Sequence, residues 1–386
     1  MKHRRKQLAG VAADIVGWVM IGGFLLAGLR FLGLPSAEGP IDQEIGATED
    51  LDLSALASQP LNLDTPGVLL SAAISPDGSQ AVMSVLAARG ERVQRVNLAE
   101  AALGAAEATM AMDVPGGLSW RTVRWSPAGS QLAARVVRSK ASQDAYDYLR
   151  ITDLDGRLVT NVITSTHGVG WFEWSPDGNH IAYISPEGEF MVYSLVSGAL
   201  TTIEENVTTP AGGGGAYFAW APDAGQLAVG KLPSIGRGNL FTVDVPGGAV
   251  TQTTHFQGYG MPDPVWSPSG EQIAFFIGDD TVDGTPELWT VRPDGSELRQ
   301  ELVLPEHPDV PFSYAGYALW LPGTARLIFV WDNELWSINV DGTDLEPLVG
   351  GVMVPAERPT ASLDGSKLLV RTGVQGTDTP IIIDLP

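Results

Sequence analysis

The sequence contains no cysteine among its 386 residues. Disulfide bridges, thiolate nucleophiles and zinc sites with sulfur ligands are therefore excluded. Basic residues are also few, because 23 Lys and Arg stand against 45 Asp and Glu, and the formal net charge is −22. A surface this acidic repels the phosphate backbone, so we expect no nucleic-acid partner.

The motifs of the common catalytic classes are missing too. There is no Gly-x-Ser-x-Gly elbow, no His-Glu-x-x-His motif and no Walker loop. Asp279, Asp280 and Asp283 begin like a calcium loop, but Thr290 stands where the twelfth position requires glutamate. We therefore predict no catalytic residues, no cofactor and no metal site, and we favour a non-enzymatic function.

A largely apolar run, residues 8–34, follows the basic tail at residues 1–7. A bilayer core about 30 Å thick needs roughly 20 helical residues, so this run predicts a transmembrane helix. A cleaved signal peptide is the alternative, but its apolar region is usually shorter, at about 7–15 residues. Pro35 also disfavours cleavage after Ala37, the one suitable position, so we predict an uncleaved anchor.

The charges on either side of this run set its orientation. Lys2, Arg4, Arg5 and Lys6 precede it, whereas no Lys or Arg occurs between Arg30 and Arg89. The positive-inside rule then places the N-terminus in the cytoplasm and the rest of the chain outside it, in the periplasm or at the cell surface. Residues 1–34 contribute +4 to the total of −22, which leaves −26 for the part expected to cross the membrane.

One phrase recurs along the rest of the chain: a short apolar strand, Trp-Ser-Pro-Asp-Gly or a near copy, and a second apolar strand. The serine of the phrase, or its equivalent, occurs seven times, at intervals of 51, 49, 46, 46, 54 and 41 residues. A period near 48 residues has room for four strands, which is one blade of a β-propeller. These seven positions are Ser75, Ser126, Ser175, Ala221, Ser267, Leu321 and Ser362.

A second glycine-containing turn follows each of the five middle copies, and it predicts the end of a third strand. These segments are residues 151–156, 191–198, 240–248, 288–295 and 335–342. The last copy leaves room for only three strands, at residues 359–363, 367–372 and 380–385. Since an open blade would expose an unpaired strand edge, we predict that residues 50–63 supply its fourth strand and pair with residues 380–385.

The repeated phrases resemble those of TolB-type propellers, the PD40 or WD40-like repeat family, over about residues 60–386. Two copies depart from the pattern, because Leu321 replaces the serine and Leu363 replaces the proline. The resemblance implies an all-β, seven-bladed β-propeller that binds protein partners on one face. The additional α/β domain of TolB and the hydrolase domain of prolyl oligopeptidases are not found in this sequence.

Aromatic, histidine and carboxylate residues gather in the connections that lead from one blade to the next. Those connections share one face of the ring, around its axis, so we predict a partner-binding mouth there with aromatic anchors. The alternative is ordinary packing between blades, and histidines from separate blades are not expected to converge on a metal. The predicted mouth comprises Trp120, His167, Trp171, Tyr217, His255, Tyr259, Asp263, Glu306, His307, Tyr314 and Tyr317.

These observations divide the chain into a cytoplasmic tail (1–7), a transmembrane helix (8–34), an acidic linker that includes the candidate closing strand (35–60) and the propeller (61–386). The favoured function is a membrane-anchored propeller that binds a protein or peptide beyond the membrane. One alternative is a propeller enzyme or carbohydrate-binding module that uses histidines and carboxylates of the mouth. Another is an accessory subunit of a membrane complex, with the helix as its contact.

Overall fold

The structure is a computed structural model of the 386-residue chain. Its description begins at Ser58 and ends at Leu385. The described residues are 58–61, 67–102, 108–113, 118–138, 147–165, 169–185, 188–204, 217–231, 238–245, 247–256, 262–277, 285–305, 315–348, 358–372 and 379–385.

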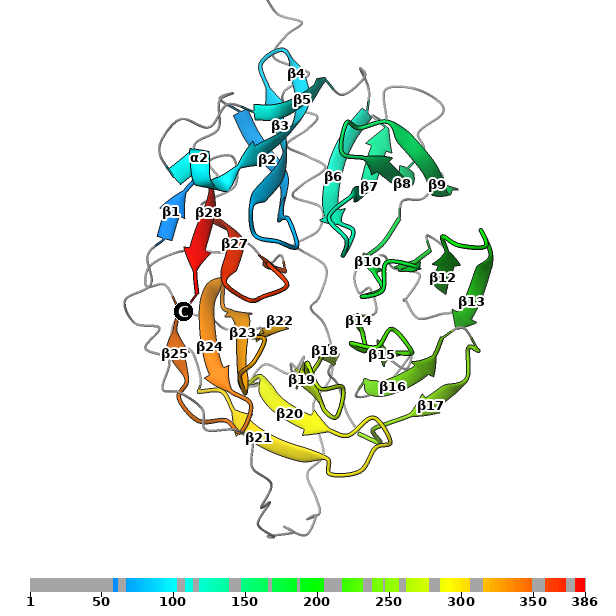
Figure 1. The fold of residues 1–386 in the computed structure, drawn as a ribbon. Coiled ribbons are helices and arrows are strands. Elements are labelled where there is room, and N and C mark those ends of the chain that lie inside the picture. The colour runs from blue at the N-terminus through cyan, green and yellow to red at the C-terminus, as the bar shows by residue number, and fades with distance from the viewer. Residues whose placement is uncertain are drawn as a thin grey trace, which may run out of the picture.

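The described residues form seven four-stranded antiparallel sheets, arranged as the blades of a ring (Figure 1). In each of blades 1 to 6, four successive strands run from the ring axis to the rim (Figure 1). The predicted all-β, seven-bladed propeller is therefore confirmed. Blade 1 is β2 (Gly67–Ile74), β3 (Gln80–Ala87), β4 (Gly90–Asn97) and β5 (Ala108–Asp113); blade 2 is β6 (Leu118–Trp125), β7 (Gln131–Arg138), β8 (Asp147–Asp153) and β9 (Leu158–Ser165); blade 3 is β10 (Phe172–Trp174), β11 (His180–Ile184), β12 (Phe190–Ser194) and β13 (Leu200–Glu204); blade 4 is β14 (Phe218–Trp220), β15 (Gln226–Lys231), β16 (Asn239–Asp244) and β17 (Val250–Gln252); blade 5 is β18 (Asp263–Trp266), β19 (Ile273–Ile277), β20 (Glu287–Val291) and β21 (Arg299–Val303); blade 6 is β22 (Ala315–Trp320), β23 (Arg326–Trp331), β24 (Glu334–Asn339) and β25 (Glu346–Pro347).

Blade 7 closes the ring with a strand from the other end of the described chain. It contains β26 (Thr360–Ala361), β27 (Lys367–Thr372) and β28 (Thr379–Asp384), and β1 (Ser58–Pro60) adds the fourth strand. β1 pairs antiparallel with β28, Ser58 opposite Ile383 and Pro60 opposite Ile381. The predicted pairing of a strand within residues 50–63 with the C-terminal strand is confirmed.

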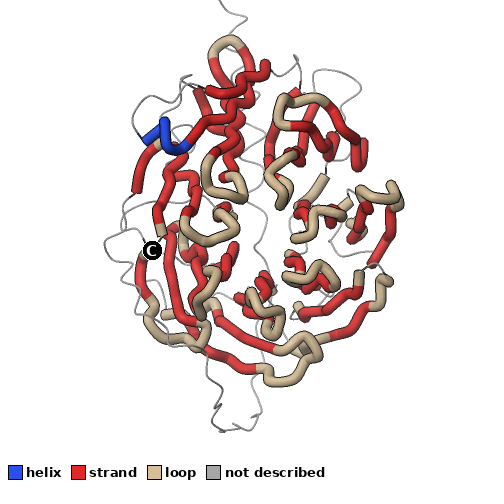
Figure 2. Tube along the Cα trace, viewed as in Figure 1, coloured by secondary structure: helices blue, strands red, loops and turns tan. Residues whose placement is uncertain are grey.

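The antiparallel order gives the ring two different faces. The turns after the first strand of each blade and after the third strand of blades 1 to 6 lie at one end, which we call the turn face (loops in Figure 2). The first strands begin and the second strands end at the opposite end, which we call the connection face. The predicted mouth residues that the structure describes lie after a fourth strand or in the first half of a first strand, toward the connection face.

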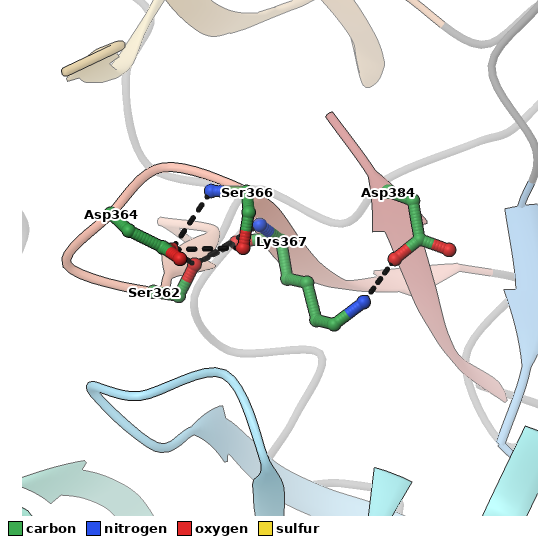
Figure 3. A network of polar contacts seen from close by, with 5 residues as sticks. All are labelled: Ser362, Asp364, Ser366, Lys367 and Asp384. Carbon is green, nitrogen blue, oxygen red and sulfur yellow. Dashed lines mark hydrogen bonds and ion pairs between the residues drawn. The ribbon is translucent and has the colours of Figure 1, made fainter. Parts of the chain in front are cut away.

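The Ser-Pro-Asp-Gly phrase forms the tight turn between first and second strands. In blade 7, the Ser362 hydroxyl donates to Asp364 Oδ1 at 2.6 Å and accepts from the Lys367 backbone N–H at 3.0 Å (Figure 3). The carboxylate also accepts from the Ser366 N–H at 3.0 Å, and Lys367 forms an ion pair with Asp384 (Figure 3). The serine hydrogen bonds lower the pKa of Asp364 to about 2. Side chains of the phrase thus satisfy the turn's own backbone groups, which explains its repetition.

The sixth copy keeps this turn without its serine. The Thr324 hydroxyl donates to the Leu321 carbonyl at 2.9 Å and accepts from the Arg326 N–H at 3.1 Å. Thr324 therefore replaces the missing hydroxyl from a position three residues later. The turn survives although Leu321 stands where the other copies carry serine or alanine.

Blades are joined by apolar cores between adjacent sheets and by the motif tryptophans. Trp125 and Trp266 are buried, and each indole N–H donates at 3.1 Å to the preceding blade, to Ala73 and Ala219 respectively. Trp174 and Trp220 are also buried, in the cores between blades 2 and 3 and between blades 3 and 4, while Trp320 is partly buried against the core of blades 5 and 6. The core thus runs around the ring as a series of interfaces.

The seam between blades 7 and 1 uses the one repeat that lacks proline. The backbone N–H of Leu363 donates to the Pro76 carbonyl at 2.8 Å. Proline has no N–H and could not form this bond. The departure at Leu363 therefore supplies a hydrogen bond across the closing seam.

The described part of the chain contains a single helix, α2 (Leu98–Ala102), between the third and fourth strands of blade 1. Asn97 caps it, since its side-chain oxygen accepts from the Ala99 N–H at 2.9 Å. No helix among the described residues is long and apolar enough to cross a membrane. The helix predicted at residues 8–34 lies outside the described residues and stays a prediction.

Candidate binding site at the ring axis

Seven side chains meet near the ring axis, and we call them the axial cluster. Five occupy one equivalent position, three residues before the motif tryptophan or the residue that replaces it: Trp171, Tyr217, Asp263, Tyr317 and Arg358. Arg124 and Glu173 stand one residue before their tryptophans, in blades 2 and 3. The first position lies at or near the start of the innermost strand, toward the connection face, and the second lies two residues further along that strand.

Arg358 of blade 7 reaches across the axis to two blades that are not its neighbours. Its Nη2 lies 2.6 Å from Asp263 Oδ1 in blade 5, and its Nη1 lies 3.6 Å from Glu173 Oε1 in blade 3. The side chains of Arg358 and Asp263 are 9% and 2% exposed, so this ion pair is withdrawn from solvent. Non-adjacent blades can meet only at the centre of a ring. Arg358 therefore spans the axis.

Tyr317 is the second residue of the cluster that links distant blades. Its ring lies 6.1 Å from that of Tyr217 in an edge-to-face arrangement, which joins blades 4 and 6. Its backbone N–H donates to Asp263 Oδ2 at 2.5 Å. Burial, together with the neighbouring Tyr217, raises the pKa of Tyr317 above its ordinary value. The two rings are partly buried, and edge-to-face pairs of this kind prefer a fixed geometry.

The Trp171 ring contacts both arginines of the cluster. The guanidinium carbon of Arg124 lies 5.0 Å from the Trp171 ring centre, and that of Arg358 lies 5.4 Å from it. Both distances fall within the range of cation–π attraction. Since two arginines are matched by Asp263 and Glu173, the cluster has no formal net charge.

This geometry suits recognition better than proton transfer at Asp263. Each of its oxygens already accepts a hydrogen bond, and burial leaves no access for a substrate. Burial raises the pKa of Asp263, while the positive charge of Arg358 opposes that rise. A general base must reach the proton that it abstracts, so Asp263 serves here as a fixed acceptor.

The structure brings together four of the predicted mouth residues: Trp171, Tyr217, Asp263 and Tyr317. The prediction that Trp120 lies at the mouth is corrected, because its side chain is 4% exposed and packs in the core between blades 1 and 2. The physical reason is a β-bulge between Trp120 and Thr122, which shifts the register by one residue and changes the side to which Trp120 points.

The remaining predicted residues do not join the axial cluster within the described structure. His255 is exposed and follows β17. Among the described residues, no group of three or more His, Cys, Asp or Glu is placed to hold a metal ion. The other predicted positions lie outside the described residues: His167, Tyr259, Glu306, His307 and Tyr314.

Sequence reasoning did not select Arg124, Glu173 or Arg358. The signal that could have found them is the register: counting back one or three residues from each motif tryptophan gives the innermost positions. Arg358 was hardest to find, because Ala361 stands in place of its tryptophan. Its reach to blades 3 and 5 depends on the closed ring, which no single repeat reveals.

Comparison with known proteins adds two findings. The family model described as TolB beta propeller domain (PD40) matches residues 130–372. A segment of 87 residues is 37% identical to the Tol-Pal system protein TolB of Alcanivorax borkumensis. That segment covers 22% of this chain and 20% of the relative, so the likeness spans about one fifth of the curated protein.

Proposed function

Because this chain belongs to the TolB β-propeller (PD40) family, we propose that it is a non-enzymatic platform that binds a protein or peptide partner on its propeller. The partner docks on the connection face, over the axial cluster. The propeller acts beyond the membrane, and residues 8–34 anchor it there as a transmembrane helix.

The observation that carries the proposal is the convergence of three aromatic side chains at one end of the ring axis. Trp171, Tyr217 and Tyr317 come from blades 3, 4 and 6, and contacts with fixed partners restrain each of them. Rigid aromatic anchors lose little conformational entropy on binding, and such residues are enriched among binding hot spots. The Arg358–Asp263 pair beside them is buried and matched in charge, so it adds no net charge to the aromatic group.

Site-specific photo-crosslinking in cells tests the partner and the face together. We expect a photoreactive phenylalanine analogue at Tyr217 to yield one specific crosslinked protein. The same analogue at Val196, which is 77% exposed in a third-to-fourth-strand turn, serves as the turn-face control and should not yield that product. Equal yields from both positions, or no specific product from Tyr217, would contradict the proposal.

The absence of cysteine allows a clean test of location and anchoring. A single cysteine at position 196, introduced as Val196→Cys, should react in intact cells with a maleimide that cannot cross the inner membrane. A cysteine introduced as His3→Cys should react only after lysis. The protein should also stay with the membrane after an alkaline wash. Labelling of position 3 in intact cells would overturn the orientation.

A further inference from the structure

We propose that Asp263 and Arg358 are positioning residues, which hold Tyr317 so that the Tyr217–Tyr317 ring pair is already formed before a partner arrives. This inference rests on the proposed function, because it assigns a role within the proposed recognition surface. It concerns two residues that need not touch the partner. Their effect is exerted through the backbone of a third residue.

The backbone of Tyr317 needs such support. Its φ is +57°, a left-handed backbone conformation that residues other than glycine rarely adopt. The strand pairing of β22 is also irregular here, with a register shift between Gly316 and Leu319. Unusual backbone of this kind persists only where the surroundings determine it. The Asp263 carboxylate, which accepts the Tyr317 N–H at 2.5 Å, is the contact that the structure supplies.

Arg358 fixes the carboxylate in turn. It donates to Oδ1 of Asp263, while Tyr317 donates to Oδ2, so each oxygen has its own donor. The guanidinium is itself held between Glu173 and the ring of Trp171. With both ends occupied, the carboxylate cannot rotate without losing one bond. The chain of contacts therefore runs from blade 3 through Arg358 and Asp263 to the ring pair.

Blades 1 and 2 contain a similar hydrogen bond, from the backbone N–H of an aromatic residue to a buried carboxylate, that is not part of the axial cluster. Glu91 is buried and accepts the backbone N–H of Trp120 at 2.5 Å, beside the β-bulge of β6. There the aromatic ring packs into the core between blades 1 and 2, and the carboxylate also accepts a hydrogen bond from the Ser84 hydroxyl at 2.7 Å. Glu91→Gln is therefore a control that perturbs a buried carboxylate of the same kind away from the ring pair.

The test uses the double substitution Asp263→Leu with Arg358→Met in the full-length protein. Removing both members avoids a lone buried charge, and apolar replacement of a buried ion pair is often neutral for stability. The tyrosines are labelled with ¹³C at Cζ, and Tyr317→Phe identifies the Tyr317 resonance. The change of this resonance with pH gives the pKa of the Tyr317 hydroxyl, and no partner needs to be present.

The two removed charges act oppositely on that hydroxyl, since Asp263 raises the Tyr317 pKa and Arg358 lowers it. A large fall in the double variant therefore reports lost burial and lost contact with Tyr217. We expect Tyr317 to titrate near the ordinary tyrosine value of about 10 in the double variant and well above it in the wild type. Glu91→Gln should leave the Tyr317 titration unchanged.

A double variant that keeps the wild-type unfolding midpoint and the raised Tyr317 pKa would overturn the inference. If the double variant does not fold, amide exchange in the wild type decides: the Tyr317 N–H must exchange slowly if Asp263 holds it, and fast exchange refutes the proposal. Neither measurement involves a partner. If the analogue at position 217 gives no specific crosslinked protein, that result counts against the proposed function but not against the role of Asp263 and Arg358.

Discussion

The substitution Leu363→Pro tests how the ring is closed. It completes the usual Ser-Pro-Asp-Gly order of the repeat, so the sequence pattern alone favours it. Proline at a position whose backbone already suits it stabilises by about 0.4–1 kcal/mol, through the unfolded state. The hydrogen bond from the Leu363 N–H to the Pro76 carbonyl, at 2.8 Å, predicts the opposite sign.

The expected loss follows from two effects at the same atom. Proline removes the donor, and a typical hydrogen bond contributes about 0.5–1.5 kcal/mol net. Its Cδ would also occupy the place of the hydrogen that now points at the Pro76 oxygen. In a helix interior, the lost hydrogen bond and the clash of the proline ring with the acceptor carbonyl together cost about 3 kcal/mol. We expect a destabilisation of similar size for Leu363→Pro.

Equilibrium urea unfolding of the full-length protein in mild detergent measures this difference by tryptophan fluorescence. Leu363→Ala is the matched control, because it keeps the N–H and removes a side chain that is 66% exposed. We expect the control to stay within about 0.5 kcal/mol of the wild type. A Leu363→Pro protein as stable as the wild type, or more stable, would show that the seam bond contributes nothing.

Three further predictions concern the blades. The Gln94 side chain is 1% exposed and neither of its amide atoms has a hydrogen-bond partner among the residues that the structure describes, so Gln94→Met should raise the free energy of unfolding by about 1 kcal/mol; a lower urea midpoint would contradict this. Because hydrogen bonds from Ser362, the largest cause, and from Ser366 lower the pKa of Asp364 from 3.8 to about 2, the carboxylate's stabilisation is complete above pH 3.8 and disappears toward pH 2. Ser362→Ala should weaken this acid dependence in urea titrations at a series of pH values, and an identical dependence would refute the role of the hydroxyl. Deleting residues 381–386 removes three buried isoleucines at about 2–5 kcal/mol each, enough to unfold the domain; an unchanged melting temperature would exclude closure by this strand.

The repeats predicted the fold well because their information is local. Each phrase specifies one turn through its own hydrogen bonds, and seven copies specify seven blades. Closure by β1 was also predictable, since a blade with three strands needs a fourth. Even the irregular copies keep the turn, as Thr324 does in blade 6.

The site was predicted only in part, because side-chain direction depends on register and on distant blades. One bulge residue was enough to turn Trp120 into the core. Arg358 escaped notice because its partners, Asp263 and Glu173, lie 95 and 185 positions away in sequence and meet it only in the closed ring. Alternation within single strands cannot supply that information.

Amide hydrogen exchange of the propeller, with and without the crosslink-identified partner, measures directly which face is used. We predict that binding slows exchange at the starts of the innermost strands of blades 3, 4 and 6, in residues 169–172, 217–219 and 315–318. The turns of the turn face, including residues 362–366 of blade 7, should exchange at the same rate in both states. Protection confined to the turn face would contradict recognition at the ring axis.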